Sequence, residues 1–146
     1  MKDNYYTPDI EDLRVGYECE IRNNASANDH WIKGILDTNF FLISLKLNNW
    51  IENIRTTYLT KKQIESLKWR YIDKDVFANF INERDKKKYD TLIFKKKDME
   101  LLWIEELNMI NIGTRDDMGY INSRYIGECK DINTLKYLQK LLNIKL

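Results

Sequence analysis

Two lysine triplets are the residues of this chain whose type and spacing best fit a binding surface. They occupy positions 86–88 and 95–97 and bracket an expected strand at 89–94. In an extended chain Lys88 and Lys95 lie about 23 Å apart, so the triplets form a basic stripe that can follow a phosphate backbone. The candidate binding residues are Arg84, Lys86, Lys87, Lys88, Tyr89, Lys95, Lys96 and Lys97.

The lysines have a second physical interpretation. Strand ends and edge strands often carry lysine, because its charge prevents one sheet from pairing with another. An acidic group near the N-terminus is the alternative binding face, and if the two groups lie on opposite surfaces the protein can dock on either kind of partner. This acidic face comprises Asp9, Glu11, Asp12, Glu18 and Glu20.

The chain offers few residues for catalysis or metal binding. His30 is the only histidine and lies among turn-forming residues, which favours a surface loop over a catalytic triad. Glu18 and Glu20 share a strand face expected to be solvated, and Asp116-Asp117 matches no calcium loop and indicates a turn. We therefore predict no catalytic residue, no metal and no cofactor. A metal-dependent nuclease that uses Glu18, Glu20 or Asp116 is the enzymatic alternative.

The two cysteines, Cys19 and Cys129, have no second cysteine or histidine nearby at metal-ligand spacing. We expect both to be reduced, buried thiols, because a reducing compartment disfavours disulfides. A bridge that ties the first long strand to the last is the alternative.

Length and composition predict one cytoplasmic domain over residues 1–146. The chain is 43% hydrophobic, which is enough for a core, and its 24 basic against 23 acidic residues give a net charge of +1. A chain so balanced is not a polycation that binds nucleic acid throughout, so any electrostatic recognition must be local. We expect no signal peptide, because acids stand where an apolar stretch is needed, and no membrane-spanning segment.

The first half of the chain predicts a hairpin followed by a short helix. Residues 14–22 alternate, with Val15, Tyr17, Cys19 and Ile21 on one face, and a second strand is expected at 31–36 after a loop at 23–30. Residues 37–50 fit a buried strand or a short helix, with helix slightly favoured at 37–46. A strand at 53–59 leads to a capping box formed by Thr60 and Gln63, which starts a helix at 61–67 with Ile64 and Leu67 inward. Pro8 to Asp12 fits one helical turn.

The second half predicts a meander closed by a helix. Residues 69–72 are expected to be extended and residues 75–84 helical. Strands are expected at 89–95, 100–107, 109–113 and 120–129, joined by turns at 96–98 and 114–117, so they must pair antiparallel. An amphipathic helix is expected at 131–144, and its apolar stripe comprises Ile132, Leu135, Leu138, Leu141 and Leu142, with Lys136 and Lys140 outside.

These elements define an α+β fold. We expect a curved antiparallel sheet, made of the N-terminal hairpin and the C-terminal meander, with a short central helix and a C-terminal amphipathic helix. Tyr5, Tyr6 and Trp50 lie in less patterned segments and are candidate interface anchors, because aromatic side chains concentrate binding energy.

Two stretches of the sequence carry a family resemblance. They read YTPDIEDLRVGYECE at residues 6–20 and RTTYLTKKQIESLKW at residues 55–69. Their order and spacing resemble those of a family of small proteins of Bacteroidetes phages and prophages, which continue with a β-rich half and a closing leucine-rich helix. The family supplies no catalytic motif to transfer, and this chain departs from its pattern in the lysine-rich middle and in the loop at 23–30.

The resemblance implies a small protein of a mobile element acting in the bacterial cytoplasm. Accessory genes of this kind often encode inhibitors of host defence that act by stoichiometric binding. The resemblance therefore implies an anti-CRISPR-type inhibitor of an RNA-targeting type VI effector. Such an inhibitor contacts the effector protein or its complex with RNA. A nucleic-acid-binding accessory protein of phage replication or transcription is the alternative, and a phage structural protein is a further one.

Overall fold

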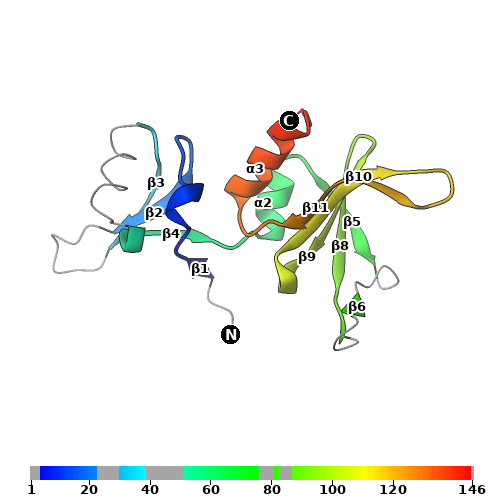
Figure 1. The fold of residues 1–146 in the computed structure, drawn as a ribbon, viewed down its shortest axis with the longest axis horizontal. Coiled ribbons are helices and arrows are strands. Elements are labelled where there is room, and N and C mark those ends of the chain that lie inside the picture. The colour runs from blue at the N-terminus through cyan, green and yellow to red at the C-terminus, as the bar shows by residue number, and fades with distance from the viewer. Residues whose placement is uncertain (1–3, 23–29, 39–50, 76–80, 83–86, 146) are drawn as a thin grey trace. The chain divides into compact units, whose positions relative to one another are not determined.

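The computed structural model describes residues 4–22, 30–38, 51–75, 81–82 and 87–145. The chain forms two compact units, Met1–Tyr58 and Leu59–Leu146 (Figure 1). The prediction of one domain over 1–146 stays a prediction, because compactness alone does not show whether either unit folds independently. The predictions for residues 23–29 and 39–50 lie outside the described residues.

The N-terminal unit is built on a four-stranded antiparallel sheet of order β1-β4-β2-β3. The predicted hairpin is confirmed, since Glu18 pairs with Ile35 and Arg22 with Trp31. A core of Leu13, Tyr17, Cys19, Leu36 and Ile54 is buried in this unit. The elements are β1 (Tyr5–Tyr6), η1 (Ile10–Asp12), β2 (Glu18–Arg22), β3 (Trp31–Ile35), η2 (Ile51–Asn53) and β4 (Ile54–Thr57), so the predicted helical turn near Pro8 and the strand after residue 53 are both present.

The first strand starts later than its alternating pattern predicted. Gly16 has φ +91°, a left-handed conformation that glycine adopts without strain, and β2 begins only at Glu18. Val15, which was predicted to face the core, is therefore 48% exposed. The prediction was wrong for residues 14–17 because alternation alone does not show where a chain turns.

The C-terminal unit is built on a five-stranded antiparallel sheet of order β11-β10-β9-β8-β5. The predicted meander is confirmed, with consecutive strands β8 to β11 paired as neighbours. A separate two-stranded ladder pairs β6 with β7. The strands are β5 (Arg70–Asp75), β6 (Ile81–Asn82), β7 (Lys87–Lys88), β8 (Thr91–Lys96), β9 (Met99–Ile104), β10 (Met109–Arg115) and β11 (Ile121–Glu128), with η3 (Glu105–Leu107) between β9 and β10.

Two helices belong to the C-terminal unit. In α2 (Lys61–Ser66) both hydrogen bonds of the predicted Thr60–Gln63 capping box are present, and in α3 (Ile132–Leu141) the side chain of Asp131 accepts from the Thr134 N–H. The helices bury Ile64, Leu67, Ile132, Leu135 and Leu138 in one core with Trp69, which lies between α2 and β5, and with the sheet residues Phe94, Leu101, Trp103, Ile110 and Ile112.

Two details of the helical predictions were wrong. Residues 75–84 were predicted to be helical, but Asp75 ends β5, and Ile81 and Asn82 form β6, which pairs with β7. The rest of this prediction, residues 76–80 and 83–84, lies outside the described residues. A short apolar run fits the helical period as well as the strand period, so the pattern alone did not show the strand pairing of Ile81 and Asn82. Leu141, placed on the apolar stripe of the last helix, is 61% exposed, because the helix ends there.

The α+β fold class is confirmed, together with the central and C-terminal helices. The hairpin and the meander form separate sheets rather than one. No helix in the described part of the chain is long and apolar enough to cross a membrane.

Candidate nucleic-acid interface

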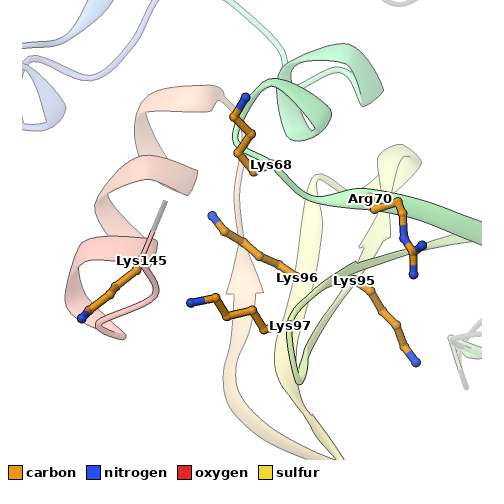
Figure 2. Close-up of a pocket in the computed structure, with 6 residues that line it drawn as sticks. All are labelled: Lys68, Arg70, Lys95, Lys96, Lys97 and Lys145. Atoms are coloured by element: carbon orange, nitrogen blue, oxygen red, sulfur yellow. The ribbon is translucent and has the colours of Figure 1, made fainter.

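In the C-terminal unit, the described residues that line a cavity of about 490 Å³ all have basic side chains. They come from three segments that lie far apart in the sequence but meet at one end of the sheet (Figure 2). We call this cavity the basic pocket, and its residues are Lys68, Arg70, Lys95, Lys96, Lys97 and Lys145.

The end of α2 positions the first two of these residues. Lys68 has φ 69°, the left-handed conformation that commonly ends a helix, and its N–H donates to the Glu65 carbonyl over 2.9 Å. The chain then leaves the helix through buried Trp69 and enters β5 at Arg70. Because Arg70 pairs with Lys95 in the sheet, the side chains of these two residues lie on the same face.

The turn between β8 and β9 positions Lys95, Lys96 and Lys97. Lys97 has φ 57° in the two-residue turn that it forms with Asp98. Successive strand residues point to opposite faces of a sheet, so the triplet is divided between the two faces. In Figure 2 the head groups of Arg70 and Lys95 point to one side of the turn, and those of Lys96 and Lys97 point to the other.

The end of α3 positions Lys145. Asn143 is left-handed with φ 54°, and the Ile144 N–H donates to the Gln139 carbonyl over 2.8 Å, which is the Schellman pattern of a helix end. This stop brings the tail back to the β8–β9 turn. A neighbouring cavity of about 310 Å³ shares Lys96, Lys97 and Lys145 with the basic pocket, and its other lining residues are Asp98, Met99, Arg124, Asn143 and Ile144.

Lys96 is a buried structural residue, although the sequence placed it in an exposed stripe. Lys96 is 7% exposed, and its Nζ donates to the Leu67 carbonyl over 2.8 Å and to Oε1 of Gln139 over 3.2 Å. The same Oε1 accepts from Trp69 Nε1 over 2.7 Å. Burial, and then the charge of Lys97, lowers the pKa of the Lys96 amine. Its role is to hold α2, β8 and α3 together at the pocket wall.

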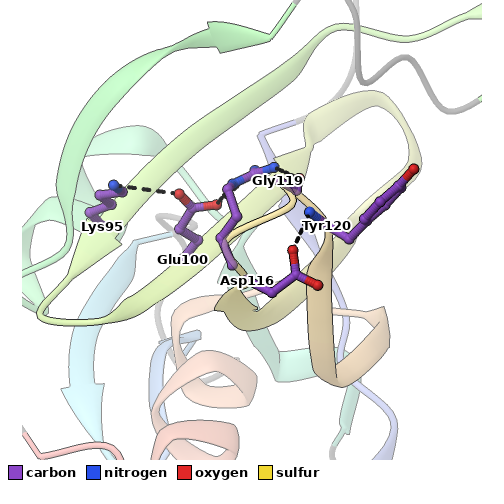
Figure 3. Close-up of polar contacts among 6 residues, drawn as sticks. Lys95, Glu100, Asp116, Gly119 and Tyr120 are labelled. Atoms are coloured by element: carbon purple, nitrogen blue, oxygen red, sulfur yellow. Dashed lines mark hydrogen bonds and ion pairs between the residues drawn. The ribbon is translucent and has the colours of Figure 1, made fainter.

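Lys95 contacts the buried carboxylate of Glu100 (Figure 3), and Arg115 pairs with the same carboxylate. Glu100, whose side chain is only 6% exposed, lies 2.7 Å from Nη2 of Arg115 and 3.6 Å from Nζ of Lys95. Arg115 also donates to the Gly119 carbonyl over 2.6 Å. Part of the charge of Lys95 is therefore balanced inside the protein.

The first lysine triplet has no described side chain, so its place relative to this pocket stays outside the described part of the chain. Lys87 and Lys88 form the short strand β7, and Arg84 and Lys86 lie outside the described residues. Tyr89 was expected to contact a partner, but it is 6% exposed and belongs to the interior. Of the predicted stripe, the described lining of the basic pocket includes Lys95, Lys96 and Lys97.

The predicted acidic face is interrupted in the N-terminal unit. Arg55 donates from Nε to the Glu20 carboxylate over 2.6 Å, and the Glu20 side chain is 12% exposed, so the prediction of a solvated Glu20 was wrong. Glu18 and Glu20 lie on one sheet face with Lys33 and Arg55, as their pairing requires. Asp9, Glu11 and Asp12 are exposed in and before η1.

The remaining chemical candidates occupy ordinary structural positions. His30 is exposed just before β3. Asp116 accepts from the N–H groups of Met118 and Tyr120, which confirms a turn at Asp116-Asp117, although Thr114 and Arg115 of the predicted turn belong to β10. Figure 3 shows the contact between Asp116 and Tyr120. Within the described residues, no group of three His, Cys, Asp or Glu side chains is placed to hold a metal ion.

Both cysteines are buried and free, as predicted. Burial, and then the charge of Glu20, raises the pKa of the Cys19 thiol to about 11. Burial, and then the charge of Asp131, raises the pKa of the Cys129 thiol further still. Neither thiol is therefore activated as a nucleophile.

Sequence reasoning missed Lys68, Arg70 and Lys145. These side chains belong to a helix end, a strand start and the C-terminal tail, and only the tertiary fold brings them beside the second triplet. The only sequence signal was that basic residues directly follow two expected helices.

Comparison with known proteins gives no further identification. Scanned against protein-family models, curated proteins and solved structures, the chain matches none.

Proposed function

We propose that this chain is a non-catalytic binding protein that holds the phosphate backbone of RNA in the basic pocket of its C-terminal unit. The observation that supports it is the described lining of this pocket, which has six basic side chains and, among the described residues, no acidic side chain, in a chain of net charge +1. Such local separation of charge attracts a polyanion, and lysine and arginine are the main phosphate ligands of nucleic-acid-binding proteins.

Four of the six side chains are suited to direct contact with phosphates. Lys96 is committed to Leu67 and Gln139, and Lys95 shares the Glu100 carboxylate. The exposed residues Lys68, Arg70, Lys97 and Lys145 are the proposed phosphate ligands. Arg70 has a planar fork that can bind two phosphate oxygens, whereas the lysines act as point charges.

We propose further that the RNA belongs to a host-defence nucleoprotein. This step rests on the resemblance to Bacteroidetes phage proteins, which implies an inhibitor that acts by stoichiometric binding, with an RNA-targeting type VI effector as the target. A protein that occupies the RNA path of an effector needs no active site. The proposal that the pocket binds RNA phosphates rests on the pocket lining and does not depend on this resemblance.

Fluorescence anisotropy with a labelled single-stranded RNA tests the pocket. We expect the triple variant Lys68→Gln, Lys97→Gln and Lys145→Gln to bind at least about tenfold more weakly than wild type, because three phosphate contacts are lost. The matched control is Lys62→Gln, Lys136→Gln and Lys140→Gln, which removes the same charge from exposed positions outside the pocket. Equal affinities of the two variants contradict the proposal.

A cleavage assay with a purified type VI effector tests the biological step. The inhibitor hypothesis predicts that one equivalent of the protein stops RNA cleavage and that the triple pocket variant does not. If the protein binds naked RNA but leaves the effector active, the accessory role in phage replication or transcription replaces the inhibitor hypothesis.

A further inference from the structure

The sheet of the N-terminal unit has one core face and one face rich in aromatic and basic side chains. Residues paired directly across an antiparallel sheet share a face. Glu20 pairs with both Lys33 and Arg55, Arg22 pairs with Trp31, and Tyr5 pairs with Thr57. Cys19 and Ile54 point to the opposite face, which is the core. We call the face that carries Glu20 the aromatic face. Its residues are Tyr5, Glu18, Glu20, Arg22, Trp31, Lys33, Ile35, Arg55 and Thr57.

Arg55 lies between two aromatic rings on this face. The central carbon of its guanidinium is 3.9 Å from the ring centroid of Tyr5 and 4.2 Å from that of Trp31. The Glu20 carboxylate holds the same guanidinium from the side at 2.6 Å. Each contact restricts the rings, so their orientation is fixed before any ligand arrives, which lowers the entropy cost of stacking on them.

Trp31 is the aromatic residue of this face that both Arg22 and Arg55 approach. It is partly exposed at the start of edge strand β3, and the guanidinium carbon of Arg22 lies 5.2 Å from its ring centroid. Lys33, two residues along the same strand, is exposed. The basic side chains Arg22, Lys33 and Arg55 outnumber the carboxylates Glu18 and Glu20, and Arg55 is already paired with Glu20.

We propose that the aromatic face is a second binding site, which stacks unpaired bases of a single-stranded nucleic acid on Trp31 and Tyr5. Arg55 already covers the ring faces that it contacts, so a base stacks on the exposed part of the Trp31 ring, whose orientation Arg55 fixes. The phosphates between the bases need nearby cations, which Arg22 and Lys33 supply. This site differs from the basic pocket in unit and in chemistry, and it shares with the proposed function only the class of partner.

A comparison of single-stranded with double-stranded RNA tests this site in the full-length chain. The probes are oligouridine of about ten nucleotides, whose bases are accessible, and a duplex of the same length, whose bases are not. We expect Trp31→Leu to weaken oligouridine binding about tenfold and to leave duplex binding unchanged, because base stacking on one aromatic residue contributes about that factor. Trp31→Phe, which keeps a ring, should restore most of the affinity, and Ile35→Ala on the same face should change neither.

The outcomes separate this site from the basic pocket. If Trp31→Leu and wild type, with equal thermal stability, bind oligouridine equally, the aromatic face is not a base-stacking site. If Trp31→Leu weakens both probes equally, the residue acts only through the fold and the proposal also fails. If the triple pocket variant binds like wild type while Trp31→Leu loses oligouridine, the pocket proposal fails and the aromatic face stands.

Discussion

The amine of Lys96 donates a hydrogen bond to the side-chain carbonyl of Gln139 over 3.2 Å, which connects β8 to α3. Gln139 is 2% exposed and also accepts from the indole of Trp69. A single buried amide thus joins the strand, the helix and the aromatic core behind the basic pocket. Lys95 and Lys97, on either side of Lys96, are exposed, so residues of one type in one triplet have different roles.

Replacement of Lys96 should therefore destabilise the fold. Lys96→Met keeps the apolar stem but leaves the Leu67 carbonyl and Gln139 Oε1 without the amine donor. We expect the free energy of unfolding to fall by about 2 kcal/mol, because hydrogen bonds from a charged donor are lost in a buried site. Urea unfolding measures this, and Lys97→Met is the control, for which we expect almost no change. Equal stabilities of the two variants would rule out the structural role.

The buried thiols should make the protein less stable as the pH rises above 9. Unfolded cysteine ionises near its ordinary pKa of 9.0, whereas Cys19 in the folded chain does so near 11 and Cys129 higher still. Between these values the folded state holds more protons than the unfolded state, so stability falls with increasing pH. Lys96, whose folded pKa is lowered from 10.5, contributes the opposite slope below that value.

Urea unfolding at a series of pH values checks this balance. We expect stability to decline from pH 9 to 11 in wild type. The decline should be shallower in Cys129→Ala and steeper in Lys96→Met. A pH profile that is identical in Cys129→Ala and wild type would show that Cys129 does not titrate as its burial requires.

Lys68→Gly should change the stability of the protein and its RNA affinity in opposite directions. This residue holds a left-handed backbone conformation that costs a non-glycine residue about 1 kcal/mol. Lys68→Gly should therefore raise the free energy of unfolding by up to about 1 kcal/mol while it weakens RNA binding through loss of a pocket charge. Lys68→Ala, which loses the charge but keeps the strain, should weaken binding without the gain in stability. RNA affinity that rises together with stability in Lys68→Gly would exclude Lys68 as a phosphate ligand.

The fold was more predictable from the sequence than the site. The Thr60–Gln63 capping box and the strands around the 97–98 turn depend on local patterns, which the chain shows clearly. The start of β2 depends on a left-handed glycine, and the strand β6 depends on its pairing with β7. Hydrophobic periodicity reveals neither feature. The hairpin and the meander form two separate sheets, where one sheet was expected. Local patterns predict strands but do not show which strands pair with each other.

The site depends on long-range packing and so was only partly predictable. The triplet 95–97 was correctly singled out as basic, but local sequence cannot show that Lys96 faces the core. Replacing all lysines of both triplets would therefore remove Lys96 as well, and a loss of binding could then reflect unfolding. The variants proposed above to test RNA binding leave Lys96 intact for this reason.

Glu100 should oppose RNA binding while it supports the fold. Its buried carboxylate balances Arg115 and part of the charge of Lys95. Glu100→Gln should lower the free energy of unfolding by about 1 kcal/mol, a modest value because both partners are substantially exposed. The same variant should bind RNA a few-fold more tightly, since more of the charge of Lys95 faces the ligand. Weaker RNA binding in a folded Glu100→Gln protein would contradict the position of Lys95 at the interface.

The most direct test of the central proposal is the salt dependence of RNA affinity in wild type and in the triple variant Lys68→Gln, Lys97→Gln and Lys145→Gln. Each phosphate contact with single-stranded RNA adds about 0.7 to the slope of log affinity against log salt. If the basic pocket holds the backbone, the triple variant should lose about 2 from the wild-type slope. An unchanged slope in the folded variant would show that these residues do not contact the phosphates.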